Sequence, residues 1–207
     1  MNIRLFAGQV VAAALLLTSA SHAFAQQVAS TDPKTAPVGT YVVEPYHTQV
    51  GFSISHLGFT NYSGVFSQAS GSLTLDPAHP GHSRLEVTIP IASVQTTSTK
   101  LDGELKSNQW FDAEKFPNAT FTSTSVVPTS TRSATVTGDF TLHGVTKPVT
   151  LKVRFIGAGI NPLDKAQTVG FEATGTIRRS DFGVKQYVPL VGDDVALVIA
   201  GAFELKK

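Results

Sequence analysis

The stretch from His47 to His56 reads HTQVGFSISH. Apolar and small polar residues alternate along it with a period of two. Successive side chains of a β-strand point to opposite faces, so this period predicts a strand with one face toward a core and the other toward water. The core-facing residues on this prediction are Thr48, Val50, Phe52, Ile54 and His56.

The same alternation recurs between Gly, Pro, Asn and Asp residues of the kind that end strands. Four further segments have an unbroken apolar face, at 85–91, 149–155, 169–177 and 195–205. Less regular candidates are 41–44, which 47–56 continues, then 65–75, 120–127 and 134–142. We predict an all-β chain of about eight antiparallel strands, which can close as a barrel or stack as a sandwich.

Residues 97–111 break this pattern. Leu101 and Leu105 stand at helical spacing there, so we predict one short helix. A turn or short helical piece is also expected between 181 and 191, because Pro189 is incompatible with a continuous central strand.

The amino terminus has the features of a secretory signal peptide. Arg4 precedes the apolar run VVAAALLL at 10–17, which is too short to span a bilayer. Ala23 and Ala25 supply the small residues that signal peptidase recognises. We therefore expect residues 1–25 to be removed and the protein to be exported to the periplasm.

After that cleavage, residues 26–38 form a polar lead-in that we expect to be flexible, and 39–207 form one domain. The whole chain has 16 basic and 15 acidic residues. Removal of Arg4 with the signal peptide makes the two numbers equal, so the mature protein is close to neutral. No basic stretch is present, so nucleic acid is not expected as a partner. The chain contains no cysteine, which excludes disulfides and thiolate sites.

The histidines fall into two groups. His79 and His82 lie in the turn-forming run DPAHPGH, and we interpret them as exposed turn residues because no carboxylate stands at an obvious ligand spacing. His47, His56 and His143 are open to three interpretations, as hydrogen-bonded structural residues, contacts to a ligand headgroup, or metal ligands. We expect no metal site and no cofactor.

The chain lacks a Gly-x-Ser-x-Gly elbow, a glycine-rich phosphate loop and paired catalytic carboxylates. We therefore expect a protein that is not an enzyme. One polar cluster, RRSDFG at 178–183, follows an apolar strand where a barrel would open to solvent. It has two interpretations, an Arg179–Asp181 pair that holds a loop, or an arginine that contacts an anionic headgroup.

Several motifs occur in a characteristic order. They are EPYHTQVGF at 44–52, HLG at 56–58, GVF at 64–66, FDAEKFP at 111–117, GDFTLHGVTKPV at 138–149, RSDFG at 179–183 and VGDDV at 191–195. In this order and at these intervals the chain resembles the YceI-like family of exported polyisoprenoid-binding proteins. It departs from the family pattern at Glu44, where Asp is usual, and at 101–105, where LDGEL replaces Arg-Asp-x-His-Leu.

The resemblance implies a lipocalin-like antiparallel barrel, usually a homodimer, that holds a long isoprenoid such as a polyprenyl or quinone-type lipid. We expect a non-enzymatic periplasmic carrier that does not span the membrane. The alternatives are a structural or stress-response envelope protein without a specific ligand, and a lipid-modifying enzyme. The expected ligand-binding residues are Val50, Phe52, Ile54, His56, Phe121, Phe140, Phe155, Phe171, Ile177, Arg178, Phe182 and Phe203.

The signal-peptide prediction has a direct test. We expect the exported protein to begin at Gln26, because Ala23 and Ala25 occupy the two positions that signal peptidase reads. Intact mass or amino-terminal sequencing of the secreted fraction measures the cleavage site. A secreted chain that still begins at Met1 would contradict the assignment.

Overall fold

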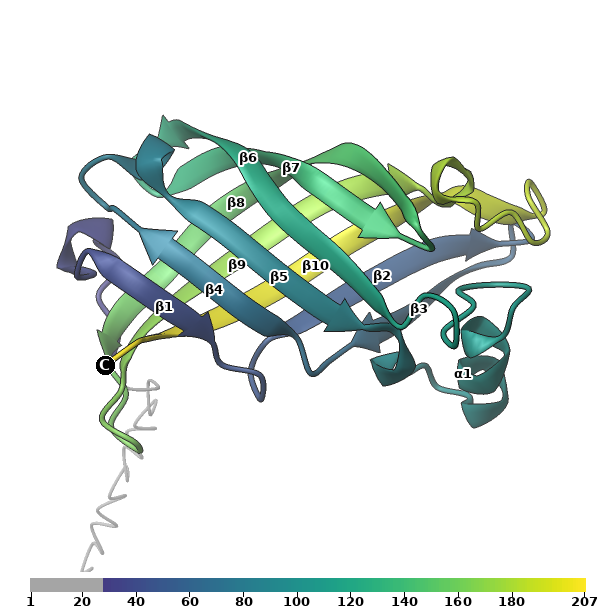
Figure 1. Ribbon diagram of the computed structural model, residues 1–207, viewed down its shortest axis with the longest axis horizontal. Coiled ribbons are helices and arrows are strands. Elements are labelled where there is room, and N and C mark those ends of the chain that lie inside the picture. Colours follow the sequence, from purple (N-terminus) through teal and green to yellow (C-terminus); the bar gives the residue numbers. More distant parts are fainter. Residues whose placement is uncertain (1–27) are drawn as a thin grey trace, which may run out of the picture.

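The computed structural model describes residues 28–207, so the expected signal peptide of residues 1–25 lies outside the described residues. The described chain is mostly β-structure (Figure 1). The strands are β1 (Gly39–Val43), β2 (Gln49–His56), β3 (Thr60–Phe66), β4 (Ser70–Leu75), β5 (Arg84–Pro90), β6 (Asn118–Ser130), β7 (Ser133–Leu142), β8 (Val145–Ile160), β9 (Gln167–Arg178) and β10 (Val191–Leu205). The helices are α1 (Thr99–Lys106) and the 3₁₀ turns η1 (Pro33–Thr35), η2 (Pro80–His82), η3 (Ile91–Ser93) and η4 (Arg179–Phe182).

All these strands belong to one antiparallel sheet that closes on itself. Its order is β1-β4-β5-β6-β7-β8-β9-β10-β2-β3, and β1 also pairs with β10. β1 and β2 lie end to end along one edge of β10, and β4 and β3 lie end to end beside them. The segments therefore make eight long strands of a closed barrel, which confirms the barrel and excludes the sandwich.

One predicted strand differs from the structure. The segment 65–75 was expected to be continuous, but it is divided between β3 and β4, and β3 begins earlier, at Thr60. The division occurs at Gln68, whose φ of 57° is incompatible with an extended strand. The start of β3 is rich in small polar residues, so alternation does not reveal it.

The bend between β1 and β2 is held by side chains together with one backbone hydrogen bond, from the Glu44 N–H to the Ala202 carbonyl at 2.9 Å. Glu44 accepts hydrogen bonds from the backbone N–H groups of Tyr46 and His47, both at 2.9 Å, which closes a small loop. The Thr48 hydroxyl then occupies the gap in the ladder, because it donates to the Ala202 carbonyl at 3.2 Å and accepts from the Ala202 N–H at 3.0 Å. Both backbone groups of Ala202 are thus satisfied where the strand is interrupted.

The predicted faces of the strands are confirmed. Phe52 points into the barrel opposite Gly64 of β3, where a Cβ atom would lie only 2.5 Å from the Phe52 ring. Glycine is required at that position because the aromatic ring occupies the place of its side chain. The residues buried most deeply in the barrel include Tyr41, Ile91 and Val169.

The predicted helix is present but shorter than the expected span of 97–111. Ser98 caps its first turn by accepting a hydrogen bond from the Leu101 N–H at 3.4 Å. The helix ends after Lys106, because Ser107 adopts an extended backbone and donates its hydroxyl to the Glu104 carbonyl at 2.7 Å. Residues 107–117 continue as turns.

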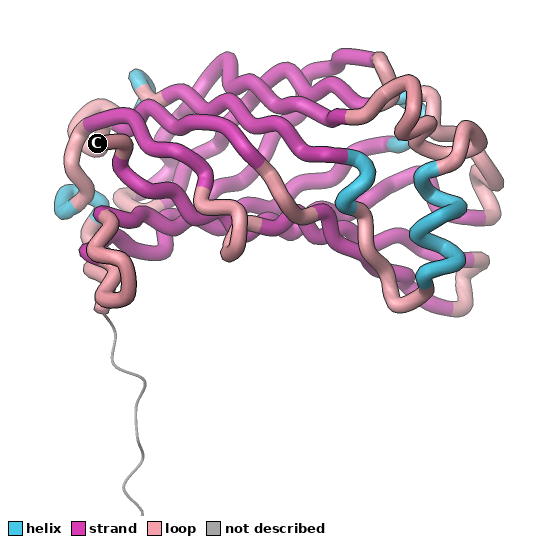
Figure 2. The backbone as a smooth tube through the Cα atoms, turned by 60° about the horizontal axis from the view of Figure 1, so that its bottom comes forward, coloured by secondary structure: helices cyan, strands magenta, loops and turns pink. Residues whose placement is uncertain are grey.

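The helix α1 lies across one end of the barrel, beside η3 (Figures 1 and 2). We call this the helix end, and we call the opposite end, near η1 and η2, the η2 end. At the helix end a second, small hydrophobic cluster packs under α1. Its buried members are Val94, Leu105, Trp110, Val184 and Val191.

Part of the expected flexible lead-in is instead paired with the barrel. Ser30 exchanges two backbone hydrogen bonds with Ala158 of β8, at 2.8 and 2.9 Å, and Ala36 is buried. The polar composition of this segment concealed the backbone pairing, which depends little on side chains.

The segment 181–191 consists of the end of η4 and a series of turns before β10, as predicted. Among residues 28–207, no helix is long and apolar enough to cross a membrane.

Two neighbouring substitutions test the inward and outward faces of β2. Phe52→Asp should lower the melting temperature by on the order of 10 °C, because it puts an unpaired charge among apolar side chains. Ser53→Asp, which projects from the other face, should be tolerated. Thermal unfolding followed by circular dichroism measures both, and equal midpoints would contradict the face assignment.

Candidate ligand-binding cavity

The barrel encloses an elongated cavity of about 680 Å³. This volume falls within the roughly 300–1,000 Å³ that small-molecule pockets occupy. The wall includes Leu101, Leu105 and Trp110 at the helix end and Pro77, Pro80 and Ser130 at the η2 end. The cavity therefore runs along the length of the barrel.

All but two of the twelve predicted ligand-binding residues line this cavity. The two exceptions are Arg178 and Phe182. Those that line it are Val50, Phe52, Ile54, His56, Phe121, Phe140, Phe155, Phe171, Ile177 and Phe203. The alternation of β2, β8, β9 and β10 thus identified much of the wall from sequence alone.

Aromatic rings form two groups on the wall. Phe171 contacts Phe155 on one side and Phe203 on the other, with ring centroids 5.5 and 6.1 Å apart. Nearer the helix end, Phe66 lies 5.6 Å from Phe52 and 5.7 Å from Phe111. Such edge-on and tilted contacts hold the rings in place and leave an apolar surface that suits a hydrocarbon chain.

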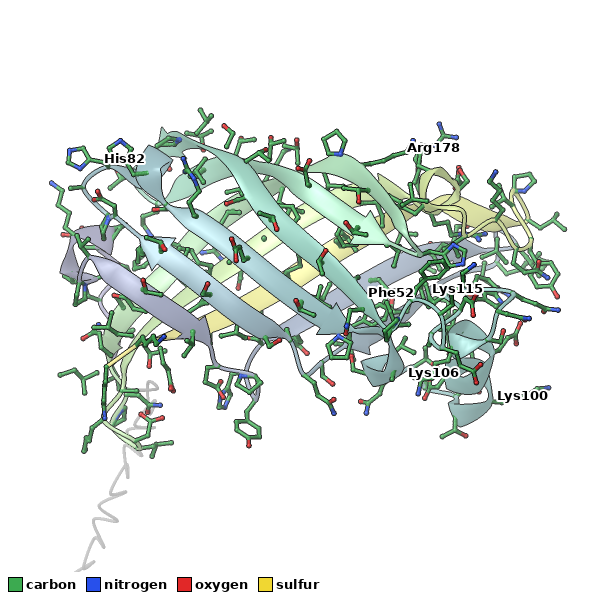
Figure 3. All side chains as sticks on the ribbon, viewed as in Figure 1. Phe52, His82, Lys100, Lys106, Lys115 and Arg178 are labelled. Atoms are coloured by element: carbon green, nitrogen blue, oxygen red, sulfur yellow. The ribbon has the colours of Figure 1, made fainter. Side chains whose placement is uncertain are left out.

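Arg178 lies outside the cavity. Its side chain points away from the barrel (Figure 3), and it donates from Nε and Nη2 to Oδ2 of Asp193 at 3.2 and 3.1 Å. Burial alone would raise the pKa of Asp193, but hydrogen bonds from Ser180 and Arg178 hold it below its ordinary value. Arg178 therefore stabilises a surface loop, and its predicted place beside a headgroup is corrected by the structure.

Phe182 also lies behind the wall. It is buried and packs edge-on against Phe140, with ring centroids 5.3 Å apart. Its carbonyl lies 3.3 Å from Nδ1 of His143. Phe182 thus packs behind Phe140, which lines the cavity, and supports it from the outer side.

The arginine that lines the cavity at the helix end is Arg179, which was not among the ligand-binding residues expected from the sequence. Only 4% of it is exposed. It donates to the carbonyls of Val184, Val191 and Gly192 at 3.0, 2.9 and 2.8 Å, so it attaches the loop before β10 to the end of β9.

Arg179 is a buried cation at the helix end of an apolar cavity. Burial lowers its pKa, an effect that the charge of Asp193 opposes. Its guanidinium lies 5.3 Å from the centre of the Trp110 ring. Three of its five N–H groups donate to the loop carbonyls, so the group has further capacity to donate.

The expected Arg179–Asp181 pair is not what holds this loop. Asp181 lies 3.9 Å from Nζ of Lys147, and Arg179 uses backbone carbonyls instead. Strict alternation after Ile177 turns Arg178 outward and Arg179 inward. That register was the signal that could have identified Arg179.

At the η2 end, three charged side chains line the cavity. Arg132 donates from Nη2 to the Phe155 carbonyl at 3.1 Å, and its half-buried side chain lines the wall. Asp76 and Arg84 also line this end. Charged side chains are thus confined to the two ends, and the middle of the cavity is apolar.

The three histidines left open by the sequence have separate places. His47 lies 2.6 Å from Glu44 on the surface, His143 packs against Phe116, and His56 lines the cavity. They do not converge as metal ligands among the residues described. Within residues 28–207, no hydrogen bond joins a serine to a histidine, the pairing that activates a serine nucleophile.

Comparisons with known proteins identify a family whose members are similar to this chain in sequence and in fold. A family model of the YceI-like domain matches residues 41–203. The chain is 40% identical over 157 residues to Protein YceI of Escherichia coli O6:H1, which covers 76% of this chain and 81% of that protein. It is also 40% identical over 167 residues to a UPF0312 protein of Pseudomonas fluorescens, covering 77% and 84%.

Solved structures agree with these sequence matches. Burkholderia cenocepacia BcnA is similar with a TM-score of 0.70 and 25% identity, over 77% of this chain and 98% of BcnA. A polyisoprenoid-binding domain from Saccharophagus degradans, implicated in plant cell wall breakdown, has a TM-score of 0.59 over 82% of this chain and 100% of that domain. At 12% identity the second likeness shows the fold alone.

The contrast between the two neighbouring arginines can be tested by replacing each with methionine. Arg179→Met should destabilise the fold by at least about 2 kcal/mol, because buried carbonyls lose their donor. Arg178→Met should unfold near the wild-type midpoint, because the arginine is exposed and Asp193 keeps its bonds from Ser180. Denaturant unfolding measures both, and equal losses would contradict the assigned roles.

Proposed function

The chain belongs to the YceI-like family, and on that premise we propose that its barrel binds one long-chain isoprenoid lipid, of the polyprenyl or quinone type, without altering it chemically. The observation that carries the proposal is the apolar cavity that runs from the helix end to the η2 end. An elongated hydrocarbon fits this shape, whereas a compact polar metabolite would leave most of the wall in contact with water.

Burial of the tail would supply most of the affinity. Each buried CH₂ contributes about 0.8 kcal/mol. A few five-carbon units are therefore enough to offset an association cost of roughly 4–15 kcal/mol. Because this contribution is not directional, the cavity would select for chain length and shape, and polar groups would set the orientation.

We place the polar end of the ligand at the helix end, beside Arg179. This arginine is the most deeply buried cation on the cavity wall, and a charge in a low-dielectric site attracts an anion more strongly than an exposed one. Its place over Trp110 and its remaining N–H groups suit a phosphate or a quinone oxygen.

The helix end is also the proposed route of entry. Beyond Pro90 the ladder between β5 and its neighbours ends, and the free edge of β3 is paired only by the bridge from Val65 to Gln95 within residues 28–207. The opening is covered by α1 and the side chains beneath it. Movement of α1 would break side-chain contacts but no strand pairing, so it could admit a lipid without opening the barrel.

We further propose that the protein acts in the periplasm as a carrier of this lipid. The signal-peptide features of residues 1–25 support export. A structural envelope protein whose barrel is merely filled, and a lipid-modifying enzyme, are the two competing hypotheses. Binding without turnover separates the proposal from the enzyme, and specific binding separates it from the structural protein.

A matched pair of substitutions on β10 tests whether the lipid occupies the cavity. Leu197 lines the cavity, whereas its neighbour Val198 is 64% exposed on the outer face. Leu197→Trp should reduce the affinity for a polyprenyl phosphate at least about tenfold, or 1.4 kcal/mol, because the indole fills the space of the tail. Val198→Trp should bind as the wild type does. Equilibrium binding of a radiolabelled ligand measures both.

Two outcomes would contradict the proposal. Equal affinities of the two variants, with melting temperatures showing that both are folded, would remove the lipid from the cavity. Equal wild-type affinities for a polyprenyl phosphate and the polyprenol of the same length would remove Arg179 from the headgroup site.

A further inference from the structure

The loop between β4 and β5 brings two imidazoles and a carboxylate together. Among residues 28–207, Asp76, His79 and His82 are the one group of three His, Asp or Glu side chains with ligand atoms all within 4.8 Å of one another. No carboxylate was expected at a suitable spacing, but the tight turn folds Asp76 back onto both histidines. His82 lies at the η2 end, at the opposite end of the barrel from Lys100 and Lys106 of α1 (Figure 3).

One nitrogen of each imidazole lies close to the same carboxylate oxygen. Nδ1 of His79 and Nδ1 of His82 lie 3.2 and 3.8 Å from the same atom, Oδ2 of Asp76. The two rings are stacked, with centroids 5.4 Å apart and planes inclined by 27°. With metal–ligand bonds of about 2.1 Å, tetrahedral ligand atoms are separated by about 3.4 Å, so only small side-chain rotations are needed to admit an ion.

The backbone of this loop is already fixed. Oδ1 of Asp76 accepts hydrogen bonds from the N–H groups of Ala78 and His79, both at 3.0 Å, while Oδ2 remains directed at the imidazoles. The turn η2 adds a bond from the His82 N–H to the His79 carbonyl at 2.8 Å. Binding of an ion would thus cost only the ordering of two exposed imidazole side chains, because the backbone that carries them is already ordered.

We propose that Asp76, His79 and His82 form a binding site for one borderline divalent transition-metal ion, such as Zn²⁺, Ni²⁺ or Cu²⁺. Two nitrogen ligands and one carboxylate oxygen suit these ions and do not suit Mg²⁺, which prefers oxygen ligands alone. Three protein ligands leave at least one coordination position open to solvent. Asp76 also lines the cavity, so a bound ion would stand at its η2 end.

Calorimetric titration of the purified full chain, without a histidine tag, tests the site with Zn²⁺ and Ni²⁺. We expect one ion per chain, no binding of Mg²⁺, and a loss of affinity of at least about tenfold for His79→Ala and for His82→Ala. Asp76→Asn should also weaken binding while it keeps an oxygen to accept the loop N–H groups.

The matched control is His47→Ala. His47 is an exposed imidazole 2.6 Å from a carboxylate, Glu44, but no second histidine joins it. This variant should bind metal as the wild type does. Nuclear magnetic resonance of the histidine side chains provides a second measurement, since Zn²⁺ should shift the signals of His79 and His82 and leave that of His47 in place. Absence of saturable binding, or equal losses in all three histidine variants, would overturn the proposal.

Discussion

The structure depends on the pairing of both edges of β10. One edge pairs with β9 along most of its length, and the other pairs first with β2 and then with β1. The barrel closes where β1 pairs with β10, and the strand that lies along this edge of β10 is bent at residues 44–48. Thr48 supports the bend, because its hydroxyl accepts from the Ala202 N–H and adds a second donor to the Ala202 carbonyl, which also accepts from the Glu44 N–H.

The bend also explains why the barrel has two different ends. Near the η2 end the ring of strands is complete, through the pairings of β1, β4 and β5. Near the helix end β2 and β3 extend beyond β5, and the resulting gap is filled by α1 and its small hydrophobic cluster. The wall is thus joined by backbone hydrogen bonds near the η2 end, whereas part of it is completed by side-chain packing near the helix end. The side-chain packing is the easier to open, and it lies beside the buried charge of Arg179.

Much of the cavity wall was predictable because a strand with one apolar face has a period of two. That rule placed Phe52, Phe171 and Phe203 correctly, and the family resemblance supplied the barrel. The rule also turns Arg178 outward, so its selection as a headgroup ligand went against the pattern that had identified the other residues. Arg179 was overlooked because Arg178 was selected in its place, although the same alternation turns Arg179 inward.

Other features depend on contacts that local patterns do not encode. The start of β3 has few apolar residues, and its pairing with β2 is set by the hairpin at Leu57 and Gly58, whose φ angles are positive. The link between Asp76 and the two histidines arises from a turn with two prolines, in which spacing along the chain says little about distance. In both cases a tight turn brings the groups together, and the alternation of apolar residues does not reveal it.

The most direct test of the account is to identify what the native protein carries. The full chain, expressed with its own amino terminus and purified from the periplasmic fraction without detergent, would be analysed by native mass spectrometry and then by solvent extraction and lipid mass spectrometry. The account predicts one long-chain isoprenoid per barrel, released when the protein unfolds. Repeated extracts that contain no isoprenoid, from folded protein in a membrane that contains such lipids, would contradict it.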